Sequence, residues 1–266
     1  MIEFIDSHAH LSTPKFDGDR KAVLQRAVAA GVSAIVDVGS DIETSMAAAS
    51  LAEAHPGRVY ATAGVDPHVA DRFSDSAAAR IEQMLQNPRV VAVGETGLDY
   101  YYEHSQRDVQ QRAFKVHIEL ALLHDLPMIV HCREAFDDCF RLLGPHSGEL
   151  RGVAHCFTGN AKEAEAFLQL GFYVSFAGII TFSKAETLRE AASAVPLERT
   201  LIETDCPYLA PEPYRGRRNE PAWVVRVAER LAELHGCGFE AVASATTANA
   251  RKLFRLAEKP MGIGEG

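Results

Sequence analysis

The chain has 266 residues, of which 47% are apolar and 24% charged, and its 36 Asp and Glu outnumber its 27 Lys and Arg, which gives a formal net charge of −9. This composition is typical of a globular protein with a large core. The acidic balance excludes a general nucleic-acid coat. It leaves room for a nucleic-acid enzyme that uses bound metal ions and a few local arginines.

The cysteines and the hydropathy pattern indicate the cellular compartment of the protein. The five cysteines are an odd number and include no Cys-x-x-Cys pair, which predicts free thiols in a reducing compartment. No cationic segment with an apolar run follows Met1, and no uncharged apolar run approaches the ~20 residues of a membrane span. We therefore expect a cytoplasmic protein without membrane association, and no obligate protein partner is evident.

Apolar runs and helical patterns alternate along the whole chain. The runs predict strands at residues 2–10, 33–38, 59–65, 89–94, 127–130, 152–154, 172–176 and 200–204. Amphipathic patterns predict helices at 20–30, 44–55, 76–86, 106–124, 135–143, 161–170 and 184–194, with two more at 222–235 and 239–256. This alternation predicts an α/β protein whose residues 1–266 form a single-domain (β/α)8 TIM barrel. A doubly wound open sheet is the alternative.

The first predicted strand ends in His8-Ala9-His10. Side chains two residues apart in a strand share one face, so the two imidazoles can chelate one cation. Residues of the same kind end or follow other predicted strands, and together the candidate metal ligands are His8, His10, Glu95, His131, His155 and Asp205. In a barrel these strand ends meet at the C-terminal mouth.

Four imidazoles and two carboxylates are too many ligands for one tetrahedral cation, and they suit two divalent ions about 3.5–4 Å apart. We expect His8, His10 and Asp205 to hold one ion, because the eighth strand closes against the first. We expect His131 and His155 to hold the other, with Glu95 bridging. Such a ligand set admits Zn, Mn, Co or Mg. The alternative is a set of unrelated polar strand ends.

Other polar residues near these strand ends have two interpretations each. Asp6 and Glu203 lie two residues before His8 and Asp205, and each either supports a ligand from behind or has a structural partner. His68 follows the third strand and either contacts substrate or is a solvated loop residue. The cysteines that directly follow ligands are expected to face the helices as core residues, and five other histidines are expected at the surface. These are Cys132, Cys156 and Cys206, and His104, His117, His124, His146 and His235.

Several ordered motifs resemble those of the TatD family of metal-dependent hydrolases, within the amidohydrolase-like barrels. They lie at Asp6 to Leu11, Gly94 to Tyr100, Pro127 to Arg133, His155 to Gly159, Ile202 to Pro211 and Arg215 to Pro221. The resemblance runs nearly from end to end and implies a two-metal hydrolase with the character of a 3′-to-5′ exonuclease DNase. One position departs from the family, which usually has Gly-x-His-Pro-His where this chain has Asp66 before Pro67 and His68.

The resulting expectation is hydrolysis of phosphodiesters in DNA, with RNA as a second candidate substrate, by a metal-bridged hydroxide. Asp205 is expected to act as the base and Glu95 to bridge the ions. The expected substrate contacts are His68, Arg215, Arg217, Arg218 and Asn219. The arginines would hold phosphates, unless they are solvated or paired with Glu212 and Glu220.

Two other functions stay open at this point. The first is an amidohydrolase that acts on a small amide, ester or lactone, or on an aminoacyl-tRNA ester, where the metals would polarise a carbonyl. The second is a barrel that binds metal as a scaffold without catalysis.

Overall fold

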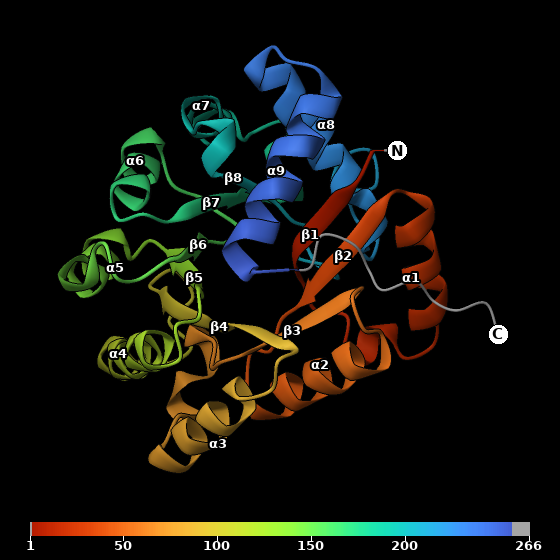
Figure 1. The fold of residues 1–266 in the computed structure, drawn as a ribbon. Helices are drawn as coiled ribbons and strands as arrows, with labels where there is room; N and C mark the ends of the chain where they lie inside the picture. The colour runs from red at the N-terminus through yellow and green to blue at the C-terminus, as the bar shows by residue number, and fades with distance from the viewer. Residues whose placement is uncertain (1, 257–266) are drawn as a thin grey trace.

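The computed structural model describes residues 2–256 and shows a closed parallel barrel with helices around it (Figure 1). The strands are β1 (Phe4–Ala9), β2 (Val32–Asp37), β3 (Val59–Ala63), β4 (Val90–Asp99), β5 (Met128–Arg133), β6 (Gly152–Ala154), β7 (Tyr173–Phe176) and β8 (Thr200–Ile202). Each pairs with the next in parallel. The chain after β8 closes the barrel, because Asp205 N–H donates to His8 O at 2.9 Å and His10 N–H to Cys206 O at 2.8 Å. The predicted (β/α)8 fold is confirmed.

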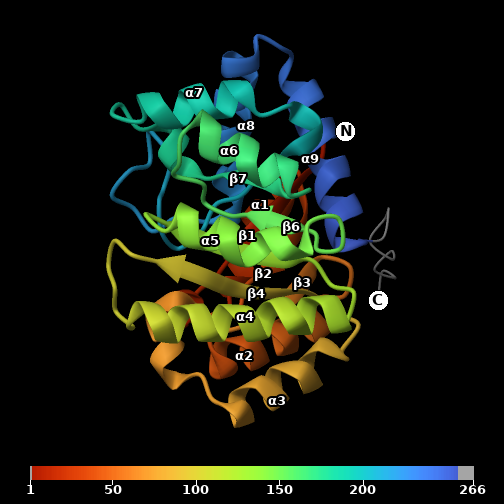
Figure 2. The same ribbon diagram turned by 90° about the vertical axis from the view of Figure 1, so that its left-hand side faces the viewer.

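Helices follow the strands around the outside of the barrel (Figures 1 and 2). They are α1 (Arg20–Ala29), α2 (Ile42–Ala54), α3 (Asp75–Leu85), α4 (Arg107–Leu123), α5 (Phe136–Leu143), α6 (Ala161–Gln169), α7 (Glu186–Ala194), α8 (Val224–His235) and α9 (Phe239–Phe254). Local sequence explains several ends. Asp41 and Asn160 open α2 and α6 with capping boxes, and Gly236 ends α8 in the left-handed conformation at φ 59°.

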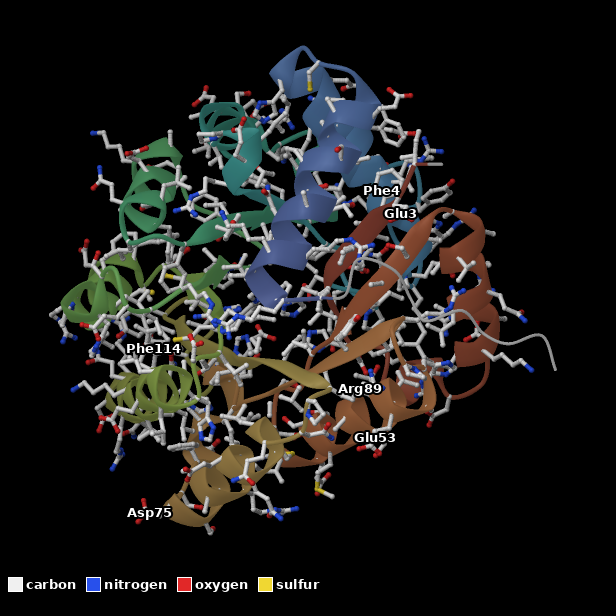
Figure 3. The ribbon with its side chains drawn as sticks, in the orientation of Figure 1. Glu3, Phe4, Glu53, Asp75, Arg89 and Phe114 are labelled. Atoms are coloured by element: carbon white, nitrogen blue, oxygen red, sulfur yellow. The ribbon has the colours of Figure 1, made fainter. Side chains whose placement is uncertain are left out.

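The apolar side chains form two layers. The outer layer lies between the strands and the helices and includes Phe114 of α4, whereas Glu53 and Asp75 point into solvent from α2 and α3 (Figure 3). The inner layer fills the N-terminal half of the barrel, where α9 adds Leu253 and Phe254 to residues of the strands. Among the described residues, the interior of the barrel is therefore filled at its N-terminal end, which leaves the C-terminal mouth for a cavity.

Strand β4 is longer than its sequence predicts. It was expected to end at Gly94 before a long loop, but it continues to Asp99 and pairs with β5 as far as Arg133. Gly97 allows this extension, because it has φ 145° and a Cβ there would collide with the carbonyl of the paired His131. Glu95 consequently lies within a strand rather than after one.

None of the helices in residues 2–256 combines the length and the apolar character that a membrane span requires. All five cysteines are free thiols, as expected.

Candidate metal centre

A cavity of about 410 Å³ opens at the C-terminal mouth of the barrel. Its walls include His10, Glu95, His131, His155 and Asp205, whereas His8 lies fully buried beneath it. The structure thus brings together the six side chains that the sequence offers as metal ligands.

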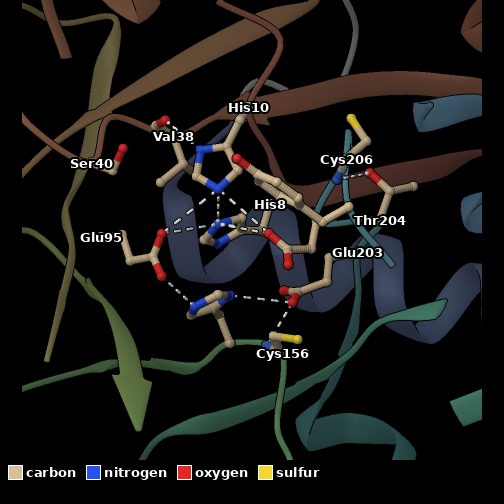
Figure 4. A network of polar contacts seen from close by, with 12 residues as sticks. His8, His10, Val38, Ser40, Glu95, Cys156, Glu203, Thr204 and Cys206 are labelled. Carbon is tan, nitrogen blue, oxygen red and sulfur yellow. Dashed lines mark hydrogen bonds and ion pairs between the residues drawn. The ribbon is translucent and has the colours of Figure 1, made fainter. Parts of the chain in front are cut away.

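One group of donors gathers around the paired histidines of β1 (Figure 4). The Nε2 atoms of His8 and His10 lie 3.2 Å apart, and both face Glu95 Oε2 at 3.5 and 3.7 Å. Asp205 Oδ1 lies 3.7 Å from His8 Nε2 and 3.4 Å from His10 Nε2. Ligand atoms bonded at about 2.1 Å to a tetrahedral ion lie about 3.4 Å apart. The spacing therefore fits a shared cation.

The proton on His10 also fits that arrangement. Its Nδ1 lies 3.0 Å from the carbonyl oxygen of Val38, which can only accept, so Nδ1 carries the proton. In the neutral form of the ring, which is the form that binds metal, the lone pair is therefore on Nε2 and points at the other ligand side chains.

A second group gathers on the other oxygen of Glu95. Glu95 Oε1 lies 2.7 Å from His155 Nε2 and 3.1 Å from His131 Nδ1, and these two nitrogens are 3.3 Å apart. The two oxygens of one carboxylate thus face two different pairs of histidines. This is the geometry that a carboxylate needs to bridge two ions.

The charge of the cavity favours cations. Burial opposes protonation of His10 and His131, but the carboxylates around them outweigh it and raise the pKa of each to about 9. Those carboxylates are Asp205 and Glu95 for His10, and Asp99 and Glu95 for His131. A buried site that attracts protons this strongly also attracts metal ions, which compete for the same lone pairs.

Comparisons with known proteins agree with this geometry. The family model described as TatD related DNase matches residues 5–255. The chain belongs to the TatD family. It is 42% identical to the metal-dependent hydrolase YabD of Bacillus subtilis over 94% of this chain and 98% of that protein. It is 39% identical to the 3′-5′ ssDNA/RNA exonuclease TatD of Edwardsiella piscicida over 95% and 100%. The crystal structure of YJJV, a TatD homologue from Escherichia coli K12, superposes with a TM-score of 0.91 at 34% identity, covering 96% of this chain and 99% of that one.

The sequence analysis of this TatD-family chain gave no role to Asp99, at the end of β4. Its Oδ2 lies 3.0 Å from His131 Nε2 and 3.6 Å from His68 Nε2, while its Oδ1 accepts the backbone N–H groups of Tyr101 and Tyr102. Burial raises the pKa of Asp99, but these hydrogen bonds outweigh it and hold the pKa at about 2. The signal was present in the sequence, because alternation from Glu95 along a longer strand puts Asp99 on the same face.

Asp6 and Glu203 have different partners. Asp6 accepts from the Thr204 hydroxyl at 2.6 Å and from Thr204 N–H at 2.9 Å, and its burial raises its pKa to about 8. It therefore joins the start of the chain to the segment after β8. Glu203 Oε1 accepts Cys156 N–H at 2.6 Å and lies 3.4 Å from His155 Nδ1 (Figure 4). Of the two, only Glu203 lies against a histidine ring.

His68 and Asp66 line the cavity from the short helix η2 (Pro67–Arg72) and the residue before it. The Asp66 carboxylate accepts His68 N–H at 2.6 Å and so caps this helix. Burial, together with the nearby charge of Glu95, raises the pKa of Asp66 to about 7. The residue that departs from the family pattern is thus part of the cavity wall.

The residues after β8 that were expected to bind phosphate do not form one site, because their contacts and their exposure differ. Arg218 forms an ion pair with Asp19 at 2.7 Å, rather than with Glu212 or Glu220. Asn219 is buried and donates to the carbonyls of Thr204 and Tyr208, so its amide NH2 group has no donor left for a substrate. None of the four residues from Arg215 to Asn219 that were expected to contact substrate lines the cavity.

Arg215 and Arg217 keep exposed side chains. Arg215 lies over the ring of Phe182 at 4.3 Å and lines a second hollow of about 490 Å³ with Lys184. This hollow adjoins the main cavity, since Thr158 lines both. Arg217 is exposed and has no ion pair or side-chain hydrogen bond within residues 2–256.

Two expectations for other residues are wrong. Cys156 lines the cavity instead of facing the helices, because the chain leaves strand geometry after β6 and Cys156 has φ 42°. Cys132 and Cys206 belong to the outer core as expected, although Cys132 also borders the cavity. His117 is not at the surface but fully buried in α4, where its Nε2 accepts Val65 N–H at 3.0 Å. Burial lowers the pKa of His117 to about 4.

Proposed function

We propose that this metal-dependent hydrolase of the TatD family cleaves phosphodiester bonds in single-stranded DNA or RNA and releases nucleotides from the 3′ end. The observation that carries the proposal is Glu95, whose two oxygens face separate histidine pairs. A site for two cations suits phosphoryl transfer, which has charge to stabilise on both the attacking and the leaving oxygen. The Edwardsiella piscicida relative, named as a 3′-5′ ssDNA/RNA exonuclease, supports this substrate class.

The ligand assignment follows from the two donor groups. His8, His10 and Asp205 would hold one divalent ion, His131 and His155 the other, and Glu95 both. Zn, Mn, Co and Mg are the candidate ions. When bound, two such ions lower the pKa of a coordinated water and stabilise the negative charge of the transition state.

Asp205 is the group that we assign as the base. Its carboxylate lines the cavity wall, and only its Oδ1 faces the histidines of β1. Burial raises its pKa, but the hydrogen bond from His10 and the neighbouring imidazoles outweigh this and lower the pKa below its usual value. Asp205 is therefore ionised at neutral pH and ready to accept the proton of an attacking water.

Local positive charge would receive the phosphates of a polyanion on this otherwise acidic chain. Arg133 lines the main cavity, and Lys184 and Arg215 line the adjoining hollow. A strand that enters both would place one phosphate at the metal centre and its neighbours near these cations. His68, on the cavity wall, is a further substrate contact in this proposal.

The test is a substrate panel on protein reconstituted separately with Zn, Mn, Co and Mg. Single-stranded DNA and RNA labelled at the 5′ end should shorten stepwise, and a label on the 3′ nucleotide should appear at once in mononucleotide. A duplex of the same sequence serves as the comparison substrate. Faster turnover of small amides, esters or lactones than of oligonucleotides with every metal would overturn the proposal in favour of an amidohydrolase.

A further inference from the structure

Three consecutive tyrosines follow β4 at the rim of the mouth, in a loop that projects beyond the strand ends (Figure 2). Tyr100 has a structural role, because its hydroxyl donates to Asp138 at 2.8 Å and accepts from Gln111 at 2.8 Å. Tyr101 and Tyr102 are different, since 53% and 52% of their surfaces are exposed. Two adjacent exposed aromatic rings beside a cavity are a candidate binding surface.

Only one of these two exposed rings lines the cavity, and it is Tyr102. A hydrogen bond fixes the backbone of Tyr102, because Asp99 Oδ1 accepts its N–H at 2.7 Å. Its ring lies parallel to that of His104 at 5.6 Å and edge-on to that of His68 at 5.6 Å. The Arg133 guanidinium lies 5.1 Å from the ring centre. These contacts hold the ring of Tyr102 in place, while 52% of the residue's surface stays exposed.

The ring is also close to the proposed metal centre. His68 contacts Tyr102 on one side and lies 5.5 Å from the ring of His131 on the other. No more than these two ring contacts separate Tyr102 from a proposed metal ligand. Asp99 links the two as well, because its Oδ1 accepts Tyr102 N–H and its Oδ2 lies 3.0 Å from His131 Nε2.

We propose that Tyr102 is a stacking platform for the base of the nucleotide next to the cleaved phosphodiester. The proposal rests on the nuclease function proposed above and adds a base-binding subsite to it. An aromatic face accepts every base, since each has a π-face, and such stacking is sequence-tolerant. Arg133 lies on the cavity side of the same ring cluster and is placed to pair with the adjoining phosphate.

The platform has a consequence for the substrate. A base can lie on Tyr102 only when it is not stacked and paired within a duplex. Single strands and frayed ends should therefore bind better than blunt duplex ends. Removal of the base at that position should weaken binding strongly, whereas exchange of one base for another should change binding little.

The test measures binding rather than turnover, with a phosphorothioate-protected single strand that resists cleavage. The strand carries 2-aminopurine at its 3′-terminal or penultimate position, and the metal-loaded protein is titrated into it. Stacking on Tyr102 should quench the fluorescence at one of these positions. Tyr102→Ala should abolish that quenching and weaken binding roughly 5- to 150-fold, the range of one stacked base. Tyr102→Phe should retain both.

The matched control is Tyr101→Ala, which removes an equally exposed ring that does not line the cavity. This ring lies edge-on to that of Tyr102 at 4.8 Å and under the Arg133 guanidinium at 4.2 Å, so the variant should weaken binding, but clearly less than Tyr102→Ala does. A strand with an abasic residue at the sensitive position should bind the unmodified protein and Tyr102→Ala equally. Thermal unfolding of each variant checks that it is folded.

The outcomes separate the two proposals. Equal losses in Tyr102→Ala and Tyr101→Ala, or a Tyr102→Ala penalty that persists on the abasic strand, would overturn the platform while leaving the nuclease function intact. If the unmodified protein neither binds nor cleaves any single strand, the nuclease function itself fails.

Discussion

The two ends of the barrel are built from the same strands and have opposite chemistry. On β5, Ile129 belongs to the apolar floor, and His131, two residues on, faces the cavity. Val153 of β6 and His155, directly after this strand, repeat the pattern. The floor is the inner apolar layer in the N-terminal half of the barrel, and α9 covers it. The mouth contains buried imidazoles and carboxylates instead. The floor supplies stability, and the mouth holds buried charged groups that a bound ligand can contact.

The largest effect that separates the two ends is expected for Glu95→Ala. Because one carboxylate faces both histidine pairs, the variant should lose cations from both groups, and phosphodiester hydrolysis should fall by at least about a thousandfold. Elemental analysis of the purified protein measures the metal. Glu119→Ala, an exposed carboxylate on α4, is the control and should retain metal and activity. Unchanged metal content in Glu95→Ala would rule out bridging.

The second largest effect is expected on stability, from a substitution in the apolar floor. Phe254→Ala removes a buried ring of α9 and should lower the free energy of unfolding by about 3–5 kcal/mol. Metal content and turnover per folded molecule should stay unchanged. Denaturant unfolding provides the measurement, and Phe254→Leu is the milder variant if the first does not fold. Leu123→Ala, whose side chain is 70% exposed, should cost little. A matching loss of metal in Phe254→Leu would show that the two ends are not independent.

A smaller effect is expected within the mouth for Asp99→Asn. The amide keeps an oxygen for the backbone N–H groups of Tyr101 and Tyr102 but removes the carboxylate that orients His131. Metal affinity should fall about 10- to 100-fold. Competition with a chelator measures it, with Asp108→Asn on the exposed side of α4 as control. Equal affinities in the two variants would leave Asp99 with a purely structural role.

The smallest effect is expected outside the cavity, for Arg217→Ala. Its guanidinium has no ion pair within residues 2–256 and is exposed to receive a phosphate, so the variant should weaken oligonucleotide binding slightly. The slope of log affinity against log salt should decrease by about one phosphate contact. Arg80→Ala, on the distant α3, is the control. If both variants keep the slope of the unmodified protein, the loop after β8 contributes no phosphate contact through Arg217.

The sequence by itself determined the barrel and the six side chains that meet at its mouth. Both follow from local rules: the alternation of apolar runs with helices sets the fold, and parallel strands bring their C-terminal ends to one edge. Potential ligands at those ends therefore lie close together, independently of the conformations of the loops.

Only the tertiary structure decided which partners these side chains have. Ile5 belongs to the floor and His8, three residues later, to the metal centre, because β1 shifts register between Asp6 and Ala9. Arg218 pairs with Asp19, which lies 199 residues away in the chain. Tyr102 lines the cavity and its neighbour Tyr101 does not. Such choices depend on strand registers and loop paths that are fixed when the whole barrel closes, and no local pattern of residues encodes them.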